Sequence, residues 1–295
     1  MSNHIFRGAA TAIITPMNPD GSVNFEEFGR LIDWQIDEKI DALIIAGTTG
    51  EGATLSDAEH KEVNEFAAEK IAGRVPMIAG TGSNDTAYGI QLSKHAEDVG
   101  ADAVLIVTPY YNKTTQDGLV KMFSEYADAL NIPVVLYNVP SRTGVNIEPA
   151  TYAKLADHGN ITAIKEANND IAKITETMAL VGDKLTLYSG NDDQIVPILS
   201  LGGQGVISVL SNVVPRETHD LVWAYLDGDL EKAKEMQFKY MEFIKALFCE
   251  TNPIPVKSAM AKMGHCGNYL RSPLYPASPA ADEKLDKAMQ ALGLI

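Results

Sequence analysis

Short runs of apolar, mostly β-branched residues recur along the chain and alternate with longer segments whose apolar residues follow a helical period. Strands of a parallel sheet read as continuous apolar runs because both of their faces are covered. We therefore expect eight buried strands, at Ala9–Pro16, Ala42–Gly47, Pro76–Gly80, Ala103–Thr108, Pro133–Tyr137, Ile161–Ala167, Thr186–Ser189 and Gly205–Leu210.

Amphipathic helices are expected between these strands. Ser56 and Glu59 have the spacing of a capping box, which predicts a helix that begins shortly after Gly52. The predicted helices include Asn24–Glu38, Asp57–Ile71, Thr86–Asp98 and Thr115–Leu130.

Eight strand–helix units predict an α/β protein that folds as a closed (β/α)₈ TIM barrel. The alternative is an open, doubly wound sheet, which usually carries a G-x-G-x-x-G turn after a strand. The nearest segment, Gly80–Asp85, lacks the last glycine of that pattern. We expect the catalytic barrel to occupy residues 1–225.

The remaining residues, 226–295, contain no further strand-like run and are expected to form a C-terminal helical bundle packed on the barrel. Further helices are predicted near Pro255–Met263 and Ala281–Leu292. The first helix of this extension is indicated by apolar residues at helical spacing, namely Leu230, Ala233, Met236, Tyr240, Phe243 and Leu247.

Composition narrows the possible functions. The apolar runs of this 295-residue chain are too short to span a membrane, and its N-terminus lacks the apolar stretch of a secretory signal. Cys249 and Cys266 suit a reducing compartment, so we expect a cytoplasmic protein. The cysteines and the six scattered histidines form no metal-ligand pattern, so no metal is expected. A net charge of −15 argues against nucleic acid as a partner.

Lys165 lies within the predicted strand Ile161–Ala167, where alternation places it on one face with Ile161, Ala163 and Ala167. Burying an ammonium beside small apolar groups is costly, and loss of the proton relieves that cost. The neutral amine that results is a Schiff-base nucleophile. A lysine at a frayed strand end, reaching water or an acidic partner, is the structural alternative.

Other candidate groups follow the ends of the predicted strands, where the active sites of barrels are built. The turn Gly47–Gly52 offers backbone amides to an anion, although an ordinary tight turn has the same composition. Tyr137 lies on the strand beside that of Lys165, and Arg142 on the next loop has the geometry that grips a carboxylate. Further candidate residues lie at the ends of strands four and seven and on strand eight, namely Tyr110, Tyr111, Gly190, Asp192, Ile207 and Ser208.

Four segments carry a resemblance to a known family. They are GTTGE at Gly47–Glu51, TPYYN at Thr108–Asn112, YNVPSRTG at Tyr137–Gly144 and IKEA at Ile164–Ala167. The chain resembles, over essentially its whole length, the dihydrodipicolinate synthase and N-acetylneuraminate lyase superfamily of class I aldolases. The arginine in YNVPSRTG and the paired tyrosines point to the dihydrodipicolinate synthases within it.

The resemblance implies a lyase that condenses pyruvate with L-aspartate 4-semialdehyde, giving 4-hydroxy-tetrahydrodipicolinate in lysine and diaminopimelate biosynthesis. No cofactor is implied beyond the covalent imine itself. The alternatives are a sister aldolase acting on a keto-sugar acid by the same imine, and a catalytically silent pyruvate-binding protein on the same scaffold.

The resemblance also implies a role for each site residue. Lys165 forms the imine, and Tyr137 is the general acid and base, linked through Thr48 to Tyr111 of a neighbouring subunit. The implied active form is therefore a homo-oligomer, commonly a tetramer. The substrate carboxylates are held by Thr49, Gly190, Ile207 and Arg142.

Many members of the family are inhibited by lysine at a subunit interface. His60, Asn84 and Tyr110 match that site, whereas Asp57 and Tyr88 replace the histidine and the glutamate of inhibited members. We therefore expect feedback by lysine to be weak or absent.

Overall fold

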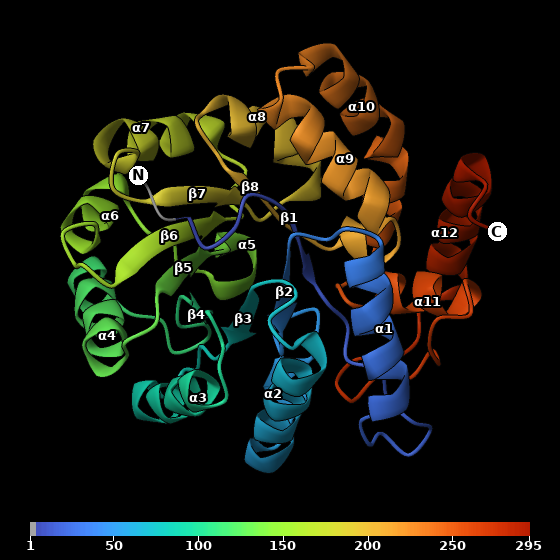
Figure 1. Ribbon diagram of the computed structural model, residues 1–295, viewed down its shortest axis with the longest axis horizontal. Coiled ribbons are helices and arrows are strands. Elements are labelled where there is room, and N and C mark those ends of the chain that lie inside the picture. Colours follow the sequence, from blue (N-terminus) through green and yellow to red (C-terminus); the bar gives the residue numbers. More distant parts are fainter. Residues whose placement is uncertain (1–3) are drawn as a thin grey trace.

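The computed structural model describes residues 4–295, and these form a closed barrel of parallel strands surrounded by helices (Figure 1). The predicted TIM barrel is confirmed. Its strands are β1 (Gly8–Ala12), β2 (Ala42–Ile45), β3 (Met77–Gly80), β4 (Ala103–Val107), β5 (Val134–Asn138), β6 (Ile161–Glu166), β7 (Thr186–Ser189) and β8 (Gly205–Ser208).

Each strand pairs in parallel with its neighbours in the sequence, and β1 closes the ring by pairing with β8, where Ala9 lies opposite Val206. Most of the strands are shorter than predicted. The first ends at Ala12, ahead of Pro16, which has no N–H to donate to a ladder. The last ends at Ser208, because Leu210–Asn212 form a 3₁₀ turn.

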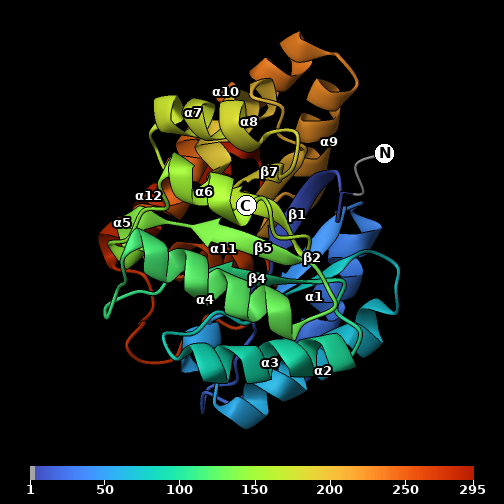
Figure 2. The ribbon, with the colours of Figure 1, turned by 90° about the vertical axis from the view of Figure 1, so that its left-hand side faces the viewer.

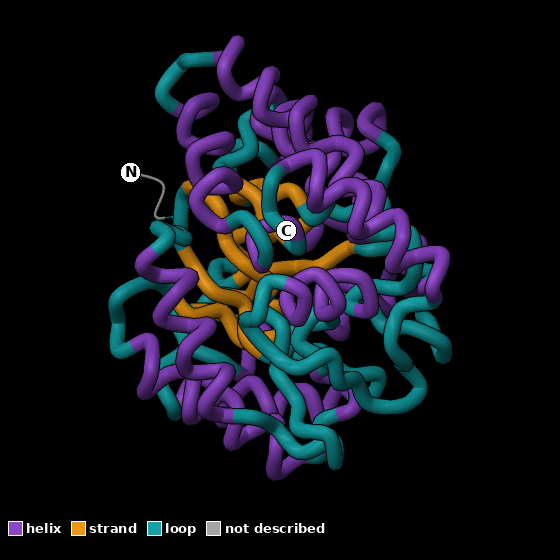
Figure 3. Tube along the Cα trace, turned by 90° about the vertical axis from the view of Figure 1, so that its right-hand side faces the viewer, coloured by secondary structure: helices purple, strands orange, loops and turns teal. Residues whose placement is uncertain are grey.

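Helices cover the outside of the barrel (Figures 1 and 3). The predicted capping box is present, since Ser56 accepts the backbone N–H of Glu59 and Glu59 accepts that of Ser56. The barrel helices are α1 (Phe25–Asp37), α2 (Asp57–Ile71), α3 (Thr86–Asp98), α4 (Gln116–Ala129), α5 (Pro140–Thr143), α6 (Pro149–Leu155), α7 (Ile171–Val181), α8 (Ile195–Ser200) and α9 (Pro215–Leu226).

Strand alternation divides the buried side chains between the barrel interior and the layer under the helices. Ala163 and Ala167 belong to the interior cluster, and Lys165 lies between them on β6. The prediction that Ile161 shares this face is wrong, because Ile161 packs in the outer cluster. The reason is an irregularity in the β5–β6 pairing, where the register shifts between Val134 and Val135.

The C-terminal extension, predicted for residues 226–295, follows the end of α9 at Leu226 and contains α10 (Leu230–Leu247), α11 (Ile254–Lys262) and α12 (Pro279–Leu292). It lies on one side of the barrel, beside α9 and α1 (Figures 1 and 2). Helix α10 packs against α9 and α12, and α11 packs against α12. Within residues 4–295, no helix combines the length and the apolar character needed to cross a bilayer.

Candidate active site

Lys165 and Tyr137 lie side by side at the carboxyl-terminal end of the barrel. Their Cα atoms are register partners on β6 and β5. The Nζ of Lys165 lies 4.2 Å from the centre of the Tyr137 ring. The lysine is only 7% exposed and the tyrosine 8%, so both groups face the interior of the barrel rather than solvent.

The environment of Lys165 favours the neutral amine. Burial, reinforced by the nearby Arg142 charge, lowers the pKa of Lys165 to about 7, against the opposing attraction of Asp192. Among residues 4–295, no side chain or carbonyl lies within hydrogen-bonding distance of its Nζ. The side chain is only 7% exposed, which argues against the alternative of a lysine that snorkels to water.

Tyr137 remains protonated at neutral pH. Burial raises the pKa of Tyr137, while the Arg142 charge and a side-chain hydrogen bond to Thr48 oppose the rise. Thr48 lies in the loop after β2 and is exposed. The structure thus brings together Lys165, Tyr137 and Thr48, and the phenol has the threonine hydroxyl as a hydrogen-bond partner.

The same loop carries Thr49, whose hydroxyl is buried. It accepts a 2.9 Å hydrogen bond from Nδ2 of Asn252, a residue of the C-terminal extension. The carbonyl oxygen of Asn252 accepts a 3.3 Å hydrogen bond from Nη2 of Arg142. Asn252 therefore lies between two predicted substrate-binding residues, a position that no local pattern in the sequence indicates.

Arg142 lies on α5, directly after β5, and its side chain is exposed. Its positive charge lowers the pKa of both Lys165 and Tyr137, so the guanidinium lies close to both groups. A cation at the rim of the site is suited to a substrate carboxylate.

Gly190 and Ile207 lie at the ends of β7 and β8. A Cβ at Gly190 would approach the carbonyl oxygen of Glu166 to 3.0 Å and Cβ of Ala167 to 2.8 Å, so only glycine fits here. Ile207 is buried in the interior cluster. Beside them, buried Asp192 accepts the backbone N–H groups of Val209 and Leu210 at 3.0 and 2.9 Å.

Tyr111 does not join the site within one chain. Its side chain is 93% exposed, and its backbone adopts the left-handed region with φ 64°. The loop after β4 therefore presents this ring to the outside of the subunit.

Glu166 is a buried carboxylate to which no role was predicted from the sequence. Its carboxylate accepts hydrogen bonds from Nδ2 of Asn138 at 3.0 Å, Oη of Tyr152 at 2.9 Å and the backbone N–H of Asn168 at 2.9 Å. These bonds connect the ends of β5 and β6, directly beside Tyr137 and Lys165. Its position in the IKEA segment, next to the lysine, is the signal that could have found it.

Residues 4–295 contain no group of three histidine, cysteine or acidic side chains placed to hold a metal ion. A cavity of about 300 Å³ opens beside the end of β7, between Asn191–Asp193 and Phe248 of the extension.

Comparison with known proteins agrees with this geometry. The sequence pattern of the Dihydrodipicolinate synthetase family matches residues 5–292. The 4-hydroxy-tetrahydrodipicolinate synthase of Acetivibrio thermocellus is 52% identical over 295 residues, covering 100% of both chains. The crystal structure of the dihydrodipicolinate synthase from Thermotoga maritima is 44% identical, with a TM-score of 0.96 over 99% of this chain and 100% of the other.

A further structure shows a related enzyme with a ligand. The dihydrodipicolinate synthase from Acinetobacter baumannii, complexed with pyruvate, is 39% identical, with a TM-score of 0.96 over 98% of this chain and 99% of the other. The chain therefore belongs to the dihydrodipicolinate synthetase family, and its activity is that of a 4-hydroxy-tetrahydrodipicolinate synthase, a lyase of lysine and diaminopimelate biosynthesis.

Proposed function

We propose that this synthase activity proceeds through an imine between Nζ of Lys165 and the ketone carbon of pyruvate. The observation that carries the proposal is a buried lysine with no hydrogen-bond partner among residues 4–295, whose pKa is lowered to about 7. About half of such a lysine is the neutral nucleophile at pH 7, against roughly one in 2,500 for an ordinary lysine. The pyruvate-bound relative from Acinetobacter baumannii supports the choice of substrate.

The chemistry then runs in four steps. Nζ attacks the ketone carbon, and water leaves as the imine forms. Loss of a proton from the pyruvate methyl group gives an enamine, whose carbon attacks the aldehyde of L-aspartate 4-semialdehyde. The aldehyde oxygen takes up a proton as the new carbon–carbon bond forms. Attack on the imine carbon by water or by the substrate's own amine releases Lys165.

Tyr137 is the group that moves protons in these steps. It lies beside the lysine, it is protonated at neutral pH, and it is hydrogen-bonded to Thr48. Transfer of a proton to the carbinolamine oxygen and to the aldehyde oxygen requires a group at this place.

Two sets of groups hold the carboxylates of the substrates. Thr49, with Gly190 and Ile207 on neighbouring strand ends, binds the carboxylate of pyruvate. Arg142 binds the carboxylate of the semialdehyde, because it is the exposed cation next to the reacting pair.

A second copy of the chain completes the proton relay in this proposal. Tyr111 is 93% exposed at the end of β4, so it reaches a relay only across an interface between subunits. We assign the active form as a homo-oligomer, a tetramer. Residues 1–225 are the catalytic barrel, and residues 226–295 are an extension that supports it.

Incubation with pyruvate and borohydride tests the imine. Borohydride reduces an imine to a stable secondary amine, so an intact mass and a peptide map will reveal one reduced pyruvate per chain on Lys165. Lys165→Met is expected to remain folded and unlabelled, whereas Lys262→Met, in a surface ion pair, will be labelled like the wild type. Labelling of a different lysine, or none in the folded wild type, contradicts the proposal.

A further inference from the structure

The C-terminal extension reaches the pyruvate-binding loop through a buried ion pair. Nζ of Lys257 on α11 pairs with Oε1 of Glu51, and both side chains are 0% exposed. The same ammonium donates to the carbonyl oxygen of Tyr269 at 2.8 Å. Oε2 of Glu51 accepts the backbone N–H of Arg271 at 3.0 Å. One loop carboxylate is thus held by two segments of the extension.

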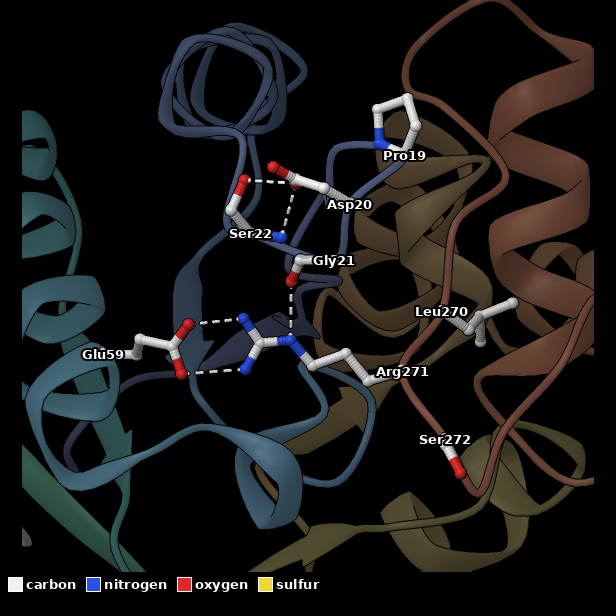
Figure 4. A pocket seen from close by; sticks show the side chains of 8 residues that line it. All are labelled: Pro19, Asp20, Gly21, Ser22, Glu59, Leu270, Arg271 and Ser272. Atoms are coloured by element: carbon white, nitrogen blue, oxygen red, sulfur yellow. Dashed lines mark hydrogen bonds and ion pairs between the residues drawn. The ribbon is translucent and has the colours of Figure 1, made fainter.

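A second ion pair holds the far end of the same loop. The guanidinium of Arg271 faces the carboxylate of Glu59 with both terminal nitrogens (Figure 4). Its Nη1 also donates to the carbonyl oxygen of Thr54 at 3.0 Å, and its Nε to that of Gly21 at 2.7 Å. Glu59 is the capping-box residue of α2, and the hydrogen bonds from Arg271 lower its pKa to about 2.

These contacts lie outside the reacting centre. Arg271 and Glu59 line an open cavity of about 580 Å³, together with Asp20 and Ser22 of the β1–α1 loop (Figure 4). In the part of the chain that the structure describes, no hydrogen bond or ion pair joins Lys257 or Arg271 to Lys165 or Tyr137. Their influence on the reaction therefore has to pass through the loop that they hold.

That loop has a backbone that needs external support. Ala46 and Glu51 adopt the left-handed region, with φ 53° and 54°, although neither is glycine. Side-chain-bearing residues keep such a conformation only where surrounding contacts hold it in place. Thr48 and Thr49, the groups assigned to proton transfer and to pyruvate, lie between these two strained positions.

We propose that Lys257 and Arg271 are positioning residues, which hold Thr48 and Thr49 in register with Lys165 by anchoring the loop at Glu51 and Glu59. The proposal rests on the pyruvate-binding role given to Thr49 above. In this proposal the extension contributes to pyruvate binding as well as to the stability of the fold. The Lys257–Glu51 and Arg271–Glu59 ion pairs are the contacts through which the extension acts on the barrel's active site.

The main test is the double variant Glu51→Gln with Lys257→Met. Removing one partner alone leaves a buried, unpaired charge and endangers folding, whereas neutralising both keeps the volume and avoids that charge. Initial rates are measured against pyruvate and against the semialdehyde, with the folded fraction followed by circular dichroism. We expect the KM for pyruvate to rise at least about tenfold and kcat to fall, with the KM for the semialdehyde unchanged.

A purely structural role gives a different result. Loss of folded enzyme lowers the apparent kcat and leaves both KM values at the wild-type level, and this outcome would overturn the proposal. The matched control is Lys262→Met, which breaks the 2.7 Å ion pair between α11 and Asp286 but touches no loop residue. We expect it to keep both KM values.

Arg271→Met is the second variant, to be used if the double variant does not fold. The Arg271 side chain is 16% exposed, and its loss leaves the Lys257–Glu51 pair intact. A rise of the KM for pyruvate of about threefold or more is expected, and an unchanged value in folded protein overturns the proposal. Borohydride trapping of the wild-type enzyme with pyruvate, done in parallel, tests the imine on Lys165 separately from the positioning role of Lys257 and Arg271. Without a trapped imine in the wild type, the proposed function itself fails.

Discussion

Lys165 and Lys257 are both buried, yet only Lys257 is paired with a carboxylate. Burial lowers the pKa of each ammonium, but Glu51 stabilises the charged form of Lys257, whereas Lys165 has no hydrogen-bond partner among residues 4–295. The difference separates a structural lysine, Lys257, from the proposed nucleophile, Lys165. A buried charge persists where it is paired, and an unpaired amine gives up its proton.

Imine formation should depend on pH through the protonation of Lys165. Because the pKa of Lys165 is about 7, kcat/KM for pyruvate should rise about tenfold per pH unit below 7 and level off above it. The rate of imine trapping between pH 5 and 9 measures this limb. A midpoint above pH 9 contradicts it.

The same shift links Lys165 to stability. Between pH 7 and 10.5 the unfolded lysine binds a proton that the folded one does not, so the free energy of unfolding should increase with pH in this range. Lys165→Met removes this contribution. The unfolding free energies of the wild type and the variant, measured by urea titration at several pH values, should therefore converge as the pH rises.

Tyr137→Phe should lower kcat by about 10²- to 10⁴-fold, because the variant loses the proton donor beside Lys165. Thr48→Val should lower kcat less, since the phenol remains. Initial rates measure both, and Tyr275→Phe, at an exposed position, is the control. A Tyr137→Phe enzyme with wild-type kcat rules out the phenol as the acid.

Arg142→Met should raise the KM for the semialdehyde roughly 10- to 100-fold, the value of a hydrogen-bonded charge pair, while pyruvate trapping persists. The pKa of Lys165 should also increase, because the Arg142 charge lowers it in the wild type. Arg216→Met, which breaks a pair with Glu38 on the surface, should change neither quantity. An unchanged KM for the semialdehyde would show that Arg142 does not bind it.

Glu166→Gln should cost about 1–3 kcal/mol of unfolding free energy, because an amide N–H₂ replaces an oxygen that accepts hydrogen bonds. Urea unfolding measures the loss. Glu125→Gln, half exposed on α4, is the control and should unfold like the wild type. Equal stability of the two variants contradicts the role given to the buried carboxylate.

Lysine at millimolar concentration should leave the initial rate unchanged. The carboxylate of Asp57 already accepts a 2.9 Å hydrogen bond from Nζ of Lys61 and is hydrogen-bonded to Tyr88. Neither substituted position therefore offers a free carboxylate to the ammonium of bound lysine. Asp57→His with Tyr88→Glu should introduce inhibition. Strong inhibition of the wild type would refute the prediction.

The sequence by itself determined the barrel and placed Lys165, our proposed nucleophile, inside a buried strand. Apolar runs alternating with helical segments specify a parallel sheet, and alternation places Lys165 on one face with the apolar residues Ala163 and Ala167. Both features are local, because strand periodicity decides which side chains share a face. The same periodicity misplaced Ile161, since it does not register the shift in pairing between β5 and β6.

Only the tertiary structure decided what holds the site. Asn252 meets Thr49, and Lys257 meets Glu51, across 203 and 206 residues of chain. No local pattern predicts such a pair, because it depends on where the extension packs after the barrel has closed. Burial then determines the protonation of Lys165, and that burial depends on side chains that several strands supply together.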